Sequence, residues 1–350
     1  MTDPTSGLGR RGFLFGAGAL GATAMLAACT GNDSDEPTGT VTPAGQSGQT
    51  GPPVTIGFSA PQADHGWIAA ISSKAEEQAA QYPDVTFRAA AATNDVNVQI
   101  SEVQALIDGG VDVLVILPFD GNALTEIGRS AMQAGIPVVN LDRIFADPLA
   151  YRAYYGGDNY GLGVNAGNYI GTRLKDGNVS DPVIVEVQGI AELELVQQRS
   201  QGFADALETY GFRVSAQQAG DFTAATGTEV MSNLLQANPH IDAVFNQDDD
   251  QGIGVLAAIE EAERDEFFMV GTGGSTDMME HIKADNTVVK ATTLYSPIMS
   301  ASAVSVARLI AQNRGLSDLP ELAVPQTMIA YSAVVTSENV DAYMPIGYRS

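Results

Sequence analysis

Short apolar runs alternate with longer amphipathic segments along this chain, and residues 111–143 show the pattern most clearly. Two runs within this stretch, 113–117 and 136–141, are rich in Val and Ile and are bounded by turn residues. Runs of this length and composition predict interior strands of a parallel sheet. Between them, apolar residues such as Leu124 and Ile127 recur at spacings of three and four, which is typical of a helix. The stretch therefore predicts a strand–helix–strand unit.

The same alternation continues on both sides of this unit. Further strands are expected at 54–59, 85–90, 154–159, 183–187, 212–217, 243–246, 267–271 and 288–294. Helices are expected to begin at Trp67 and to cover 97–107, 160–175, 196–207, 228–237, 253–263 and 298–312. Alternating strands and helices are typical of doubly wound α/β domains with a parallel sheet. Because the series starts over near residue 183, and a chain of 350 residues favours about two domains, we expect two α/β lobes with a cleft between them.

Two charged residues, Asp142 and Arg143, directly follow the predicted strand at 136–141. Open α/β sheets bind ligands at the edge formed by the carboxyl ends of their strands. A carboxylate beside a guanidinium at that edge is therefore a candidate binding group, although a plain surface ion pair would leave the same pattern.

The composition indicates a packed protein and argues against one class of partner. Hydrophobic residues make up 45% of the chain and charged residues 17%, which is enough apolar material for a large core. The formal net charge of −25 at pH 7 argues against binding to nucleic acid, whose phosphates would repel the chain. The acidic residues are spread along the sequence, so they favour solubility rather than a particular partner.

The amino-terminal residues resemble an export signal. Arg10 and Arg11 precede an apolar, glycine-rich run, and Cys29, the single cysteine, follows that run. This order is similar to a twin-arginine signal with a lipoprotein cleavage box, which implies removal of residues 1–28 and lipidation of Cys29. Residues 29–53 hold almost no apolar side chains and are expected to form a disordered tether. We therefore expect an exported protein, anchored by lipid to the outer face of the cytoplasmic membrane; the alternative is an ordinary apolar amino terminus whose cysteine is incidental.

A family resemblance rests on four segments: 136–143, 187–191 with 198–203, 220–223, and 243–250. In order and spacing they closely resemble the ribose-binding-like branch of the periplasmic sugar-binding proteins, the substrate receptors of ABC importers. The similarity extends from about residue 54 to about residue 335. It implies a type I periplasmic binding fold, whose chain crosses between two lobes three times. Lobe one is then expected to contain 54–156 and 294–323, and lobe two 157–293 and 324–350.

Matching the family's pattern residue by residue implies a ligand-binding site. The residues assigned to it are Asp64, Trp67, Asp142, Arg143, Asn159, Arg199, Phe222, Asp248 and Tyr295. In this match Trp67 and Phe222 correspond to aromatic residues that stack on the sugar, and Arg199 to an arginine that forks onto its hydroxyls. The chemistry agrees, because carboxylates and guanidinium groups each bind two hydroxyls and aromatic rings cover an apolar C–H face.

Several positions depart from the family's pattern. Gly273 stands where the family has Asp, Tyr295 where it has Gln, and Gly66 where it has an aromatic residue. Asp248 falls where the ribose receptors have Asn, and its acid partly replaces the acceptor missing at Gly273. These differences count against ribose itself. They imply another neutral polyhydroxylated ligand, either a monosaccharide or a linear sugar alcohol.

The resemblance implies a monomer that delivers its ligand to an ABC permease, without a cofactor. No enzyme is expected, because the sequence shows no nucleophile elbow and no Ser/His/Asp set. No metal site is expected either, since residues 248–250 lack the alternating spacing of a calcium loop. We expect Asp249 or Asp250 to cap the following helix, with Asp248 facing the cleft.

Three other functions are compatible with part of this sequence pattern. An exported sugar-modifying enzyme would need the catalytic groups that the sequence lacks. A sugar-responsive transcription regulator shares the two-lobed core but would need a helix-turn-helix and a basic face. A sensory lipoprotein that binds sugar without transporting it shares every feature above, so that alternative stays open.

Overall fold

The computed structural model describes residues 50–316 and 319–350. The expected export signal, Cys29 and the expected tether up to residue 49 lie outside the described residues. The last residues of that tether, 50–53, are described and contact the folded part. The amide of Gly51 donates to Asp84 Oδ2 (2.5 Å), and Gln312 Nε2 donates to the carbonyl of Pro52 (2.8 Å). Gly51 and Pro52 are therefore held against the folded part.

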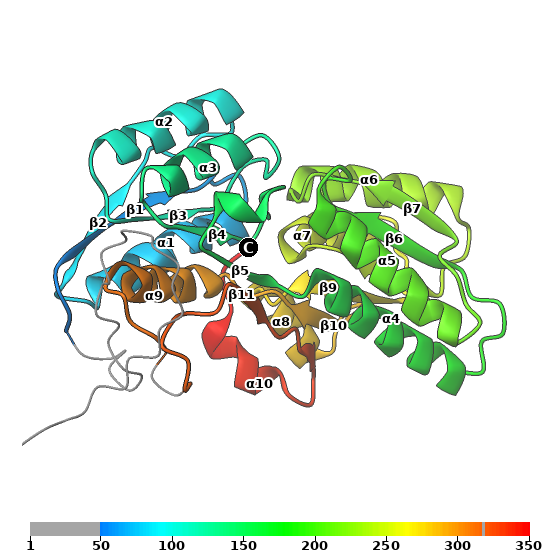
Figure 1. Ribbon diagram of the computed structural model, residues 1–350. Helices are drawn as coiled ribbons and strands as arrows, with labels where there is room; N and C mark the ends of the chain where they lie inside the picture. Colours follow the sequence, from blue (N-terminus) through cyan, green and yellow to red (C-terminus); the bar gives the residue numbers. More distant parts are fainter. Residues whose placement is uncertain (1–49, 317–318) are drawn as a thin grey trace, which may run out of the picture. The chain divides into compact units, whose positions relative to one another are not determined.

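The first of two sheets contains six parallel strands within the described residues (Figure 1). Its strands are β1 (Val54–Ser59), β2 (Val85–Ala89), β3 (Val113–Ile116), β4 (Val138–Leu141), β5 (Ala153–Gly157) and β11 (Thr327–Ala330). They lie in the order β11-β5-β4-β3-β1-β2. Every residue of β3 is buried, because helices cover both faces of such a sheet.

The second sheet repeats this plan with one difference at its edge. Its strands are β6 (Ile184–Gln188), β7 (Ala216–Ala219), β8 (Ala243–Asn246), β9 (Phe268–Gly273), β10 (Val289–Leu294) and β12 (Val334–Thr336). They lie in the order β12-β10-β9-β8-β6-β7, and β12 pairs antiparallel with β10. The expected class, two doubly wound α/β lobes, is confirmed by the matching strand orders of the two sheets.

Helices cover both faces of each sheet (Figure 1). The first sheet carries α1 (Gly66–Ala80), α2 (Val96–Asp108), α3 (Thr125–Gln133) and α9 (Met299–Ala311). The second carries α4 (Asn159–Asp176), α5 (Glu194–Thr209), α6 (Ala224–Ala237), α7 (Asp249–Glu261), α8 (Thr276–Ala284) and the short α10 (Val340–Tyr343). Two 3-10 turns, Pro148–Ala150 and Met344–Ile346, complete the described elements. We call each sheet with its helices the first and the second lobe.

The two-residue period of a strand explains how each sheet buries both faces. In β6, Ile184 packs in the core that contains α4 and α5, whereas Val185 and Val187 pack in the core formed with α6 and α7. In the first lobe, α1 and α9 pack together on one face, and α2 and α3 cover the other. Packing against these helices fixes the positions of the strand ends. Polar residues of the pocket described below follow those ends.

The structure differs from the sequence-based expectations in several elements. Strand β11 hydrogen-bonds to β5 of the first sheet, although residues 324–350 were expected in the second lobe. The chain therefore makes its last crossing after β11, not before it; the other expected lobe boundaries stay a prediction. The strand expected at 212–217 is β7, which begins four residues later. Helix α8, strands β11 and β12, and helix α10 were not expected, because their apolar residues are few and irregularly spaced.

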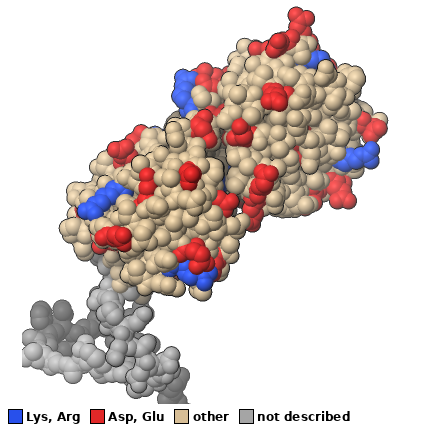
Figure 2. Space-filling view, turned by 90° about the horizontal axis from the view of Figure 1, so that it is seen from above, with Lys and Arg blue, Asp and Glu red and all other residues tan. Residues whose placement is uncertain are grey.

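Acidic side chains are scattered over the face shown in Figure 2, with few Lys and Arg among them. This distribution agrees with the net charge of −25 and shows no single charged patch on that face. Among residues 50–316 and 319–350, no helix is both long enough and apolar enough to cross a membrane.

A buried ion pair connects α9 to the start of β2. Arg308 donates from Nε (2.9 Å) and Nη2 (2.6 Å) to the two carboxylate oxygens of Asp84, and its guanidinium lies 4.3 Å from the ring centroid of Tyr82. Both charged side chains are 2% exposed. The hydrogen bonds from Arg308, Gln312 and Gly51 hold the pKa of Asp84 well below its usual range, against the opposing effect of burial. The pair therefore ties the first described residues, β2 and α9 together.

Replacing Arg308 with Leu should lower the free energy of unfolding by about 3 kcal/mol, because the Asp84 carboxylate would stay buried without its cation. Urea denaturation monitored by circular dichroism measures this change. The matched control is Lys74→Leu, which removes an exposed pair with Glu77 and should cost less than about 1 kcal/mol. Equal losses in the two variants would contradict the role of the buried pair.

Candidate ligand-binding cleft

A pocket lies where the carboxyl ends of strands from both sheets face each other. Its empty volume is about 370 Å³, part of which is open solvent. The residues that line it are His65, Trp67, Ile68, Asp142, Arg143, Leu195, Arg199, Phe222, Asp248, Thr272, Gly273 and Tyr295. Most of them follow the last residues of β1, β4, β7, β8, β9 and β10. This is the edge at which open α/β sheets bind ligands.

Seven of the nine residues assigned to the site from sequence line this pocket. They are Trp67, Asp142, Arg143, Arg199, Phe222, Asp248 and Tyr295. Asn159 lies behind the lining, where it bonds to Arg199 and Tyr295. Asp64 is not among the lining residues; its carboxylate pairs with the imidazole of His65. That these residues contact a ligand stays a prediction.

Tyr295 connects residues of both lobes. Its hydroxyl donates to Asp142 Oδ1, and its carbonyl accepts from Trp67 Nε1 (2.8 Å). The rings of Trp67 and Tyr295 are stacked with centroids 5.6 Å apart. Asp142 has a left-handed backbone (φ 62°), which short acidic residues tolerate, and this turn directs its carboxylate into the pocket. The tyrosine thus narrows the pocket while holding its acid in place.

Arg199 is buried in the wall of the pocket. It is 3% exposed, its Nε donates to Asn159 Oδ1 (2.9 Å), and its Nη1 donates to the carbonyl of Gln247 (2.9 Å). The guanidinium lies 4.5 Å from the ring centroid of Tyr295. With two donors engaged in this way, the group is held rigidly in a planar fork suited to two ligand oxygens.

Arg143 and Phe222 form other walls of the pocket. Arg143 donates from Nη1 to the carbonyl of Phe119 (2.6 Å), and its Nε has no partner among the described residues. Burial lowers the pKa of Arg143, although nearby acids oppose the shift. Phe222 has φ 73° and packs against Gly189, where a Cβ would lie 1.9 Å from the ring. A glycine at that position therefore lets the phenyl ring approach the cleft.

Three consecutive acids begin α7, and each has a different partner. Asp248 caps the helix, since its side chain accepts from the amide of Gln251 (3.0 Å). Asp249 accepts from two backbone amides in the turn after β9. Asp250 accepts from the amide of Trp67 (2.9 Å), at the start of α1 in the other lobe. The expectation that Asp249 or Asp250 caps α7 was wrong, because Asp248 has the extended backbone of an N-cap residue.

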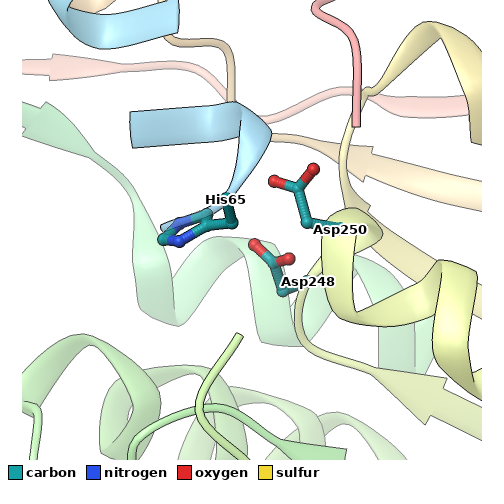
Figure 3. Close-up of side chains that lie close together, drawn as sticks. All are labelled: His65, Asp248 and Asp250. Carbon is teal, nitrogen blue, oxygen red and sulfur yellow. The ribbon is translucent and has the colours of Figure 1, made fainter. Parts of the chain in front are cut away.

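Figure 3 shows His65, Asp248 and Asp250 side by side, where the loop before α1 meets the start of α7. Burial and the charge of Asp250 raise the pKa of Asp248 to about 8. Burial lowers the pKa of His65, but the hydrogen bond to Asp64 and the charges of Asp248 and Asp250 outweigh that effect, so the net shift is upward. At neutral pH, Asp248 is therefore a proton donor as well as an acceptor.

The same three residues are the described group best placed to hold a cation, since one potential ligand atom of each lies within 4.8 Å of the others. Each side chain already has a protein partner, however. Asp64 pairs with the imidazole, and backbone amides bind both carboxylates. Hydrogen bonds from other groups therefore engage each of the three side chains, and we assign the cluster no metal.

Five lining residues were not assigned to the site from sequence with the others: His65, Ile68, Leu195, Thr272 and Gly273. The place of His65 in the first loop is the one sequence feature that favours contact with a ligand, whereas Gly273 was expected only to lack an acceptor. Leu195 and Thr272 carried no signal, because an apolar residue in the first turn of a helix and a threonine in a buried strand are ordinary core features. Leu195 precedes Arg199 by one helical turn and Thr272 directly precedes Gly273, but their place in the pocket wall is evident only from the folded structure.

These features define a two-lobed α/β protein with a polar pocket at the facing strand ends. Residues 56–315 match the family model described as the periplasmic binding protein domain. Because this match covers most of the chain, the protein belongs to the periplasmic binding protein family, and its relatives are of the ribose-binding-like branch expected from sequence.

Three known proteins illustrate the similarity. The ribose import binding protein of Escherichia coli is 35% identical over 179 residues, which cover 51% of this chain and 59% of that protein. The xylitol-binding protein of Mycolicibacterium smegmatis is 27% identical over 256 residues, 71% of this chain and 68% of that protein. A crystal structure of an ABC transporter solute-binding protein from Mycobacterium smegmatis with bound glycerol has a TM-score of 0.72 and 27% identity, covering 83% of this chain and 96% of that one. The matched part of the chain thus spans about three fifths of the length of the first of these relatives.

The free energy of unfolding should fall as the pH rises from 6 to 8. The unfolded carboxyl of Asp248 releases its proton near pH 3.8, whereas the folded chain keeps it up to about pH 8, so the folded state binds more protons in this interval. His65 acts in the same direction, because the stability from its raised pKa is present below pH 6.5 and is lost as the pH rises through the folded pKa. Urea denaturation at pH 6, 7 and 8 measures the slope.

Asp248→Asn should flatten this pH dependence, and Asp176→Asn, which changes an exposed acid, should leave it unchanged. The comparison is made above pH 6 because burial also raises the pKa of Asp249, to about 6, and that acid contributes at lower pH. Parallel curves for the wild-type protein and Asp248→Asn would show that this carboxyl does not govern the slope.

Proposed function

We propose that this protein is the solute-binding component of an ABC importer and that its cleft binds a small neutral polyhydroxylated molecule, a monosaccharide or a sugar alcohol. The observation that carries the proposal is the set of opposed acids and arginines in one small pocket. Asp142 and Asp248 face Arg143 and Arg199, with aromatic rings beside them. Such a set matches hydroxyls that both donate and accept.

The binding energy is sufficient for a typical receptor. Hydrogen bonds to charged groups contribute about 1.5–3 kcal/mol each. Three or four of them would exceed the roughly 8 kcal/mol that corresponds to micromolar affinity, and desolvation and lobe closure offset the excess.

The narrow pocket favours a short or linear ligand over a bulky ring. Tyr295 fills space between Trp67 and Arg199, where a smaller side chain would leave room. Two relatives agree with this preference: one is named as a xylitol-binding protein, and the other was crystallised with glycerol. The curated relatives are named as binding proteins, which supports a role without catalysis.

Arg199→Ala should lower ligand affinity at least a hundredfold, because it removes a charged donor that offers two hydrogen bonds. Isothermal titration calorimetry against C3–C6 alditols, pentoses and hexoses measures the change and identifies the ligand. Arg213→Ala, at an exposed arginine of the second lobe, is the control and should bind like the wild-type protein. Unchanged affinity in folded Arg199→Ala would refute the pocket assignment.

We also propose that the protein is exported and held at the membrane by a lipid on Cys29. The signal-like order of residues at its amino terminus supports this proposal. Cys29→Ser should move the protein from the membrane fraction to the soluble fraction after expression with its own leader. Fractionation with an immunoblot measures the distribution. A variant that stays entirely in the membrane fraction would exclude lipid attachment at Cys29.

A further inference from the structure

Residues 347–350 return to the cleft and occupy space next to two glycines. A Cβ at Gly66 would lie 2.0 Å from the carbonyl oxygen of Arg349 and 2.9 Å from Cα of Ser350. A Cβ at Gly273 would lie 2.6 Å from the hydroxyl of Tyr348. Gly66 begins α1 in the first lobe and Gly273 ends β9 in the second. The absence of side chains at both positions is therefore what lets this segment approach the pocket.

The backbone of the segment is held firmly. The carbonyl of Tyr348 accepts from the amide (2.7 Å) and the hydroxyl (3.0 Å) of Thr276, and Tyr348 forms a parallel bridge with Ser275. Asp277 accepts from Arg349 Nη1 (2.7 Å) and from the amide of Ser350 (2.9 Å). These contacts with the start of α8 fix the direction in which the phenol ring points.

The phenol hydroxyl of Tyr348 is buried but has no hydrogen-bond partner among the described residues. Its side chain is 5% exposed, so it is a polar group that the fold itself leaves unsatisfied. Asp249, which also lies beside Gly273, is already bound by two backbone amides and by Thr292. Burial and the charges of Asp248 and Asp250 raise the pKa of Tyr348, which keeps its proton available for donation.

The hydroxyl of Tyr348 lies beside Gly273, a pocket residue that has no side chain. Gly273 lines the pocket with backbone atoms alone, and its φ of 137° belongs to a region that other residues rarely adopt. A ligand that reaches Gly273 therefore comes within reach of the phenol beside it. An unsatisfied buried donor next to an open pocket indicates a group kept for a ligand.

We propose that the hydroxyl of Tyr348 is a ligand-binding group of this cleft, supplied by the segment 347–350 through the gap at Gly273, and that it hydrogen-bonds a hydroxyl at one end of the bound polyol. The inference rests on the proposed function and deepens it. It places a neutral donor at one end of the ligand and the charged groups of Asp142 and Arg199 elsewhere in the pocket. It also makes this end of the pocket selective for a hydroxyl over a methyl group, since a methyl group would leave the phenol unpaired.

The test compares Tyr348→Phe with the wild-type full-length chain by calorimetry against the panel of alditols, pentoses and hexoses. The variant should bind the preferred ligand about fivefold more weakly, the effect of one neutral hydrogen bond. Without ligand, its melting temperature should equal or exceed that of the wild-type protein, because the substitution removes an unsatisfied buried hydroxyl. Tyr343→Phe, in the helix just before this segment, is the matched control and should change neither value.

Two results would overturn the inference while leaving the proposed function intact. One is equal affinity in wild-type protein and Tyr348→Phe; the other is weaker binding together with a lower melting temperature in the absence of ligand, which would assign the hydroxyl a structural role. If the wild-type protein binds no member of the panel, the proposed function fails, and the inference fails with it.

Discussion

Tyr295 holds the opposed charges of the cleft together. Its hydroxyl donates to Asp142, and its ring lies against both the guanidinium of Arg199 and the indole of Trp67. Charged groups are costly to bury unless they are paired and hydrogen-bonded, so the acid and the arginine can line a small pocket only with such a partner. The tyrosine stands at the end of β10, where the chain passes from one lobe to the other. Tyr295 therefore both contacts the charged groups of the pocket and lies where the chain crosses between the lobes.

A second layer of buried amides keeps the binding groups in place. Asn159 and the carbonyl of Gln247 engage two donors of Arg199, and Gln247 Nε2 in turn donates to Glu186 Oε1 (2.7 Å). Burial raises the pKa of Glu186, although the hydrogen bonds from Ser200 and Gln247 oppose the shift. Because these side chains are fixed before a ligand arrives, less conformational freedom is lost on binding.

Much of the fold could be predicted from sequence, because buried parallel strands are apolar on both faces and stand out as Val- and Ile-rich runs. The strand-end groups Asp142 and Asp248 could be placed at the pocket for the same reason. Two predictions were wrong because tertiary contacts determine the outcome. Strand β11 pairs with the first sheet instead of the second, and Asp248 rather than Asp249 or Asp250 caps α7. Tyr348 lay beyond any local pattern, since only the folded chain brings it next to Gly273.

Trp67 is the single tryptophan in the sequence, and the fold places it in the wall of the pocket, with its indole nitrogen bonded to the carbonyl of Tyr295. Its amide is bound by Asp250 of the opposite lobe, so its surroundings depend on how the two lobes meet. The protein thus carries one tryptophan fluorophore, placed where a solute in the pocket or a movement of the lobes would alter its environment. Its emission would report either change without any added label.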